Sequence, residues 1–75
     1  MRKRFKWTTK KGDFYLAEHD GRWHVVFDEM SLGAYVNTSQ AIDDLVGGHT
    51  FSAGKGIDTS KLGIGDDLGE WERVI

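Results

Sequence analysis

The stretch FYLAEHDGRWHVVF, residues 14–27, alternates apolar and polar side chains on both sides of the pair Asp20-Gly21. This pair predicts a β-hairpin, because a two-residue type I′ turn needs positive φ at both positions, which glycine adopts freely and aspartate tolerates. With these two residues as the whole loop, His19 faces Arg22, and every pairing farther along the two strands is fixed.

The two faces of this hairpin differ in character. One carries large apolar side chains, which we expect to enter the core: Phe14, Leu16, Trp23, Val25 and Phe27. The other carries a semi-apolar set with charged residues at its margin: Tyr15, Ala17, His19, Arg22, His24 and Val26. Because successive side chains of a strand point to opposite faces, the first set orients the fold and the second is a candidate surface.

A strand is also expected before the hairpin. Residues 4–9 alternate, with Phe5 and Trp7 on the side that is most easily buried. The following Lys-Lys-Gly reads as a turn, with Gly12 at the position that needs positive φ.

A fourth strand is expected at residues 31–36. If Glu29-Met30 is its loop, or if a longer loop keeps the same register, Phe27 pairs with Leu32. This register places Tyr35 beside His24, on the second face of the hairpin.

A short helix should follow this strand. The run Asn37-Thr38-Ser39 offers N-cap residues, residues 40–46 place their apolar side chains on one helical face, and Gly47-Gly48 supplies a left-handed end. Beyond it the pattern weakens into loops and short turns. We expect its apolar residues to form a satellite cluster: Phe51, Ile57, Leu62, Ile64, Leu68 and Trp71.

The sequence therefore predicts one α+β domain over residues 1–75. Its architecture is a four-stranded antiparallel meander, with one short helix packed on one face and an irregular C-terminal segment. Cysteine is absent, which excludes disulfides and thiolate metal sites. There is no apolar run long enough to span a bilayer or to serve as a secretory signal, so we expect a soluble, cytoplasmic protein.

Charge is distributed unevenly along the chain. Residues 1–12 carry six positive charges and no acid, whereas the rest of the chain is strongly acidic, and the total is −2. A basic arm of this kind is typical either of nucleic-acid binding or of an edge strand whose lysines face water. The nucleic-acid candidates are Lys3, Arg4, Lys6, Lys10 and Lys11.

Catalytic and metal-binding constellations have little support. The spacing of His19, His24 and His49 matches no zinc signature, and the paired aspartates read most simply as surface charge. We therefore expect neither an enzyme nor a metal or other cofactor.

The second face of the hairpin supports an interaction surface. Tyr15, His24, Val26 and Tyr35 would form a patch with the composition of a protein interface. The alternative is that residues 49–75 wrap across it. The leading hypothesis is a small non-enzymatic protein-interaction module that binds a partner protein or a second copy of itself. The alternative function is nucleic-acid binding by the N-terminal basic strand.

Several short motifs resemble a family of small bacterial proteins with no established function. They are W-x-V-x-F-D from Trp23, L-G-x-Y from Leu32, and D-L-x-G-G-H-T-F from Asp44. The resemblance spans residues 13–72 and implies a bacterial accessory protein, but it brings no site residues. Its most specific segment is Gly47, Gly48, His49, Thr50 and Phe51, for which the simplest interpretation is a helix cap followed by a buried phenylalanine.

Overall fold

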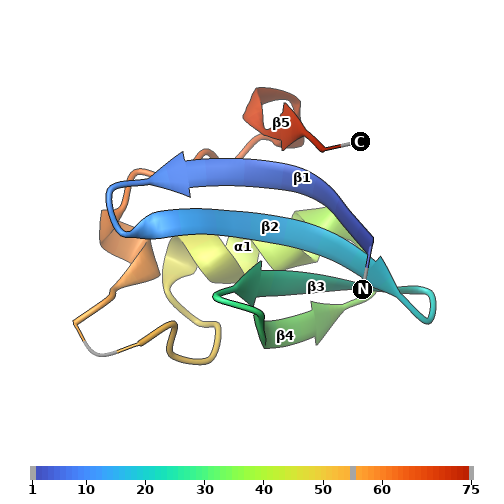
Figure 1. The fold of residues 1–75 in the computed structure, drawn as a ribbon, viewed down its shortest axis with the longest axis horizontal. Helices are drawn as coiled ribbons and strands as arrows, with labels where there is room; N and C mark the ends of the chain where they lie inside the picture. Colours follow the sequence, from blue (N-terminus) through green and yellow to red (C-terminus); the bar gives the residue numbers. More distant parts are fainter. Residues whose placement is uncertain (1, 55, 75) are drawn as a thin grey trace.

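The computed structural model describes residues 2–54 and 56–74, and over this range the fold is α+β, as the sequence predicted. One antiparallel sheet has the order β4-β3-β2-β1-β5, and helix α1 lies against one of its faces (Figure 1). The strands are β1 (Arg2–Thr9), β2 (Gly12–His19), β3 (Arg22–Phe27), β4 (Met30–Tyr35) and β5 (Glu72–Arg73). The helices are α1 (Thr38–Gly47) and two 3-10 turns, η1 (Thr59–Lys61) and η2 (Leu68–Glu70).

The predicted hairpin between β2 and β3 is confirmed. Asp20 and Gly21 have φ of 52° and 73°, and they connect the pair His19–Arg22. Leu16 lies opposite Val25, so the two strands have the register that a two-residue turn requires. The predicted turn before β2 is confirmed as well, with Gly12 at φ 131°.

The predicted register of the fourth strand is wrong. The turn consists of Asp28 and Glu29, whose φ values of 51° and 64° are unusual for residues other than glycine. A β-bulge then shifts the pairing between β3 and β4, and Tyr35 lies opposite Trp23 rather than beside His24. Both the turn and the bulge change which side chain faces which side of the sheet, and the alternation of the sequence reveals neither.

The sheet has a fifth strand, which corrects the predicted four. Short β5 returns along the free side of β1, where Arg73 lies opposite Phe5 and Glu72 opposite Lys6. The Val74 N–H donates to the Arg4 carbonyl over 2.8 Å. The β5 strand thereby covers one end of an edge that would otherwise present unpaired backbone groups. Two residues of the predicted C-terminal segment are not among the described residues, namely Lys55 and Ile75.

The helix forms where the sequence predicts it. The Asn37 side chain accepts a hydrogen bond from the Gln40 N–H at 2.9 Å and caps the first turn. Gly48, with φ 75°, ends the helix in the left-handed conformation. The helix buries Ala41, Ile42 and Leu45 against the sheet.

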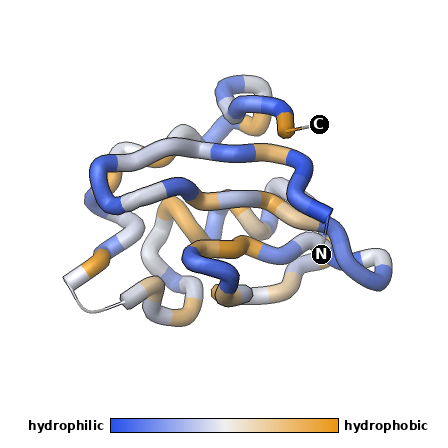
Figure 2. The backbone as a smooth tube through the Cα atoms, in the orientation of Figure 1, coloured by the Kyte–Doolittle hydropathy of each residue, from blue (hydrophilic) through white to orange (hydrophobic). Residues whose placement is uncertain are grey.

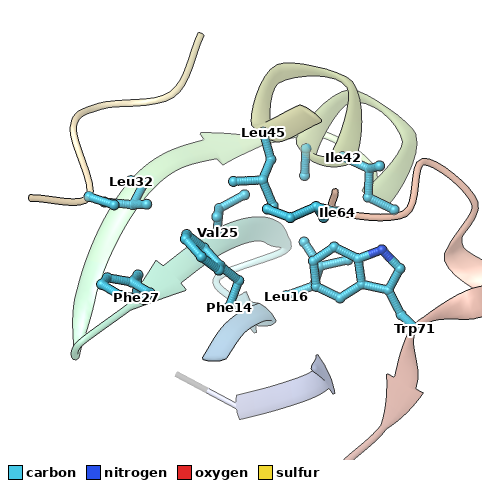
Figure 3. Packing of buried hydrophobic residues seen from close by; sticks show 11 residues of the cluster. Phe14, Leu16, Val25, Phe27, Leu32, Ile42, Leu45, Ile64 and Trp71 are labelled. Carbon is cyan, nitrogen blue, oxygen red and sulfur yellow. The ribbon is translucent and has the colours of Figure 1, made fainter. Parts of the chain in front are cut away.

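The core lies between the sheet and α1, and the C-terminal segment completes it on the same side. Figure 3 shows Leu45 and Ile42 of the helix above strand residues such as Val25, with Ile64 and Trp71 beside them. Ala53, Ile64 and Trp71 therefore pack on the helix side, and not across the opposite face as the alternative interpretation proposed. The turn between β2 and β3 extends beyond this core and is largely hydrophilic (Figure 2).

Phe51 departs from the expected cluster. Its side chain is 76% exposed, although its N–H donates to the Leu32 carbonyl over 2.9 Å. The backbone of this segment is therefore held at the free edge of β4 while the ring points into solvent. The prediction of a buried phenylalanine after the helix cap is wrong.

The free energy of unfolding distinguishes a buried side chain, such as Leu45, from the exposed ring of Phe51. Leu45→Ala removes a side chain with no exposed surface and should cost about 3 kcal/mol, since it leaves a cavity in the core. Phe51→Ser should cost less than about 0.5 kcal/mol, because little of the ring is buried. Urea denaturation of the two variants checks this, and a similar loss in both would contradict the exposed position of Phe51.

Candidate functional site

The face of the sheet that points away from α1, here called the outer face, brings together three of the four predicted interface residues. Tyr15 lies opposite Val26, and His24 lies two pairs farther along, opposite Ala17. This face is less apolar than expected, since Val26 is only 5% exposed and Ala17 is fully buried.

Two lysines of β1 flank the ring of Tyr15 on the outer face. The Lys3 Nζ lies 4.4 Å from the centroid of the ring, and Lys6 lies directly opposite Tyr15 in the register. Lys3 Nζ is 3.1 Å from the Glu29 carboxylate, and Lys6 Nζ is 3.3 Å from that of Glu72. The hydrogen bond to Glu72 raises the pKa of Lys6.

The five basic residues predicted for nucleic-acid binding do not form one surface. Lys3 and Lys6 belong to the outer face, whereas Lys10 and Lys11 form the turn at the far end of β1. Arg4 occupies a bulge in β1 and contacts Glu18. The basic run in the sequence is therefore divided among three places on the molecule.

The His24 ring makes a hydrogen-bond contact within its own sheet. Its Nδ1 lies 2.9 Å from the Ser31 hydroxyl oxygen, and its ring centroid lies 6.1 Å from that of His19. Burial, together with the positive charges of His19 and Arg22, lowers the pKa of His24. Within residues 2–54 and 56–74, no group of three histidine or carboxylate side chains gathers as metal ligands would.

Tyr35 lies on the opposite side of the sheet from the other predicted interface residues. It packs against the core and faces Trp23, and its ring covers Gly33, where an added Cβ would lie 2.5 Å from the tyrosine oxygen. Burial, together with the neighbouring Asp44 carboxylate, raises the pKa of Tyr35 to about 12.

Backbone hydrogen bonds stabilise the segment that consists of Gly47, Gly48, His49, Thr50 and Phe51. The N–H groups of Gly48 and His49 donate to the Leu45 and Asp44 carbonyls, over 3.2 and 2.8 Å, and close the end of the helix. A pocket of about 300 Å³ lies between this segment and the loop that leads to η1. Among the described residues that line it, Asp58 is the only charged one, and its carboxylate already accepts from the Ser60 N–H and hydroxyl.

A larger pocket lies on the helix side, at the end of the sheet where β1 begins. We call it the arginine groove. Its volume is about 660 Å³. Its apolar part consists of Phe5, Trp23, Leu68 and Val74, and its charged part consists of Arg2, Arg4, Arg73 and Glu18. The N-cap Asn37 and the first residue of α1, Thr38, form one wall.

The register of the strands determines which side chains line this groove. Arg2 lies opposite Glu18, which lies opposite Trp23, so these three side chains form a row across β1, β2 and β3. The bulge at Arg4 then shifts the register by one residue, and Phe5 lies opposite Leu16. Without this shift, Phe5 would lie opposite Tyr15 and point to the outer face. The bulge therefore allows Arg2 and Phe5 to share one face of the sheet.

Aromatic rings and ion pairs define the interior of the groove. The rings of Phe5 and Trp23 lie 6.1 Å apart at an angle of 40°, and both are only partly buried. The Arg4 Nε–H donates to the Glu18 carboxylate over 2.8 Å, with both side chains about 40% exposed. Apolar surface beside arginines suits a ligand that carries both an apolar group and an anion.

The sequence does not indicate this groove. It predicts Trp23 and Phe5 to be core residues, and the basic candidates do not include Arg2 or Arg73. The basic residues on either side of Phe5 in the sequence are the one local sign of such a groove. Arg2 and Phe5 share a face of the sheet, however, only because of the bulge at Arg4. Arg73 and Leu68 come from the C-terminal segment, whose pairing with β1 the local pattern does not indicate.

Comparison with known proteins finds no family model that matches this chain, no similar curated protein and no similar solved structure. The resemblance of residues 13–72 to small bacterial proteins thus stays an expectation. In the described part of the chain, no helix has the length and apolar character needed to cross a membrane.

The placement of Tyr35 predicts its titration. Phenolate absorbance should show a step with a midpoint at about pH 12, and Tyr35→Phe should remove it. The raised pKa stabilises the folded state below the unfolded value of about 10, and this contribution is lost as the pH rises toward 12. If Tyr35 lay in solvent on the outer face, the step that disappears would lie near pH 10.

Proposed function

We propose that this protein is a small non-enzymatic protein-interaction module that binds a segment of a partner protein in the arginine groove. The observation that carries the proposal is the pair of partly exposed rings, Phe5 and Trp23, beside three arginines. Tryptophan and arginine are enriched among the residues that contribute most to protein–protein binding. A hollow of about 660 Å³ is large enough for several side chains of a bound segment.

The groove is better suited to binding than the outer face. Val26 and Ala17 expose almost no surface there, and Tyr35 lies on the other side of the sheet. A homodimer through Tyr15, His24 and Val26 would thus bury mainly polar and charged groups. The groove instead offers apolar rings that the rest of the chain leaves partly open.

Selection from a random-peptide library tests the proposal. The double variant Arg2→Gln/Arg73→Gln removes two exposed charges of the groove, and Lys10→Gln/Lys11→Gln removes two from the distant turn. Wild type and the lysine variant should enrich the same peptide sequences. The arginine variant should lose them, because guanidinium groups at the groove no longer fix the bound segment.

Two results would contradict this function. One is that no related peptides are enriched on the wild-type protein. The other is that the same peptides are enriched equally on the arginine variant, which would place the binding surface elsewhere. Circular dichroism of both variants controls for loss of the fold.

Nucleic-acid binding is a second candidate, favoured by one observation on the outer face. An aromatic ring with a lysine on either side, as Tyr15 has with Lys3 and Lys6, is typical of surfaces that bind single strands. It is the weaker candidate, because both lysines already pair with glutamates.

Chromatography on immobilised single-stranded DNA tests this second candidate. It predicts retention at low salt that falls as salt rises, is lost in Lys3→Gln/Lys6→Gln and is kept in Lys10→Gln/Lys11→Gln. Elution of the wild-type protein in the unbound fraction at low salt would exclude it.

A further inference from the structure

The charge of the arginine groove indicates the chemistry of its occupant, given the proposed function on which this inference rests. Among the described residues that line it, three carry guanidinium groups and one carries a carboxylate. The whole chain has a net charge of −2, so the groove is a positive site on an acidic protein. Such a local excess attracts an anionic group and repels a cationic one.

Glu18 already occupies part of this positive site. It accepts a hydrogen bond from the Arg4 Nε–H at 2.8 Å, in the way that a carboxylate of a bound segment would. Both side chains are about 40% exposed, so neither is locked in the core. Arginine presents five N–H donors, and an incoming carboxylate competes with Glu18 for those of Arg4.

The surroundings of the groove favour a short acidic segment over a long polyanion. Asp67 directly precedes Leu68 in the chain, and Glu70 follows Leu68 by two residues. Both carboxylates are on exposed residues. A nucleic-acid strand that continued past the groove toward η2 would meet these negative charges, whereas a segment with one or two carboxylates would end at the arginines.

We propose that the arginine groove binds an acidic peptide segment that places a carboxylate on Arg2, Arg4 and Arg73 and an aromatic or aliphatic side chain on the rings of Phe5 and Trp23. Glu18 is the internal competitor for this carboxylate. It lowers the affinity for acidic segments and makes binding depend on their displacing it from Arg4.

Titration of the full chain with two capped tripeptides, followed by NMR, tests this inference. The probes are acetyl-Asp-Phe-Asp-amide and acetyl-Asn-Phe-Asn-amide, in which neutral carboxamides of the same shape replace the two carboxylates. The acidic peptide should shift the indole N–H signal of Trp23 and the Nε–H signal of Arg4. The indole signals of Trp7 and Trp71 are internal controls, because those rings pack on each other 5.8 Å apart, outside the groove.

Affinities of matched variants separate the roles of the charges. The neutral peptide should bind the wild type roughly tenfold more weakly than the acidic one, and Arg4→Gln should weaken the acidic peptide by about the same factor. Glu18→Gln should strengthen the acidic peptide about threefold, because the competitor is removed. Lys10→Gln/Lys11→Gln should bind as the wild type does.

Several outcomes would overturn the inference. Equal binding of the two peptides would remove the requirement for a carboxylate, and unchanged or weaker binding by Glu18→Gln would remove its role as competitor. An oligodeoxythymidylate that shifts Trp23 at lower concentration than the acidic peptide would assign the groove to nucleic acid. If library selection yields groove-dependent peptides without acidic residues, this inference fails while the proposed function stands.

Discussion

The tight turn at Asp20-Gly21 is the constraint on which the rest of the structure depends. It holds two consecutive residues at positive φ, and it therefore leaves one possible alignment of β2 and β3. A shift of one residue would move Leu16 and Val25 from the core to the outer face. The helix, the C-terminal segment and the strands on either side all pack against the apolar face that this alignment creates.

Irregularities in the flanking strands then modify this frame. The bulge at Arg4 brings Arg2, Arg4 and Phe5 toward one end of the helix side, and the bulge between β3 and β4 turns Tyr35 toward the core. Each inserts one extra residue and reverses the side-chain alternation beyond it. The groove exists because of the first bulge, and the outer face lacks a second tyrosine because of the other.

Much of the fold could be predicted from local chemistry, and the candidate site could not. Asp20-Gly21 and Asn37 signal their turn and cap through their own backbone preferences. Asp28-Glu29 gives no such signal, since glutamate seldom adopts positive φ, and the predicted register beyond it is therefore wrong. Phe51 looks like a core residue by composition, but only its backbone is held, at the free edge of β4. The groove joins β1, β3 and η2, whose proximity is a tertiary property.

The proposed function requires that Phe5 and Trp23 share the helix side of the sheet. Nuclear Overhauser effects between their ring protons in solution measure this, because the contact requires both the hairpin register and the bulge at Arg4. We predict strong ring-to-ring contacts between Phe5 and Trp23, whose centroids lie 6.1 Å apart. Contacts of the Phe5 ring with Tyr15 instead would place Phe5 on the outer face, and the groove would not exist.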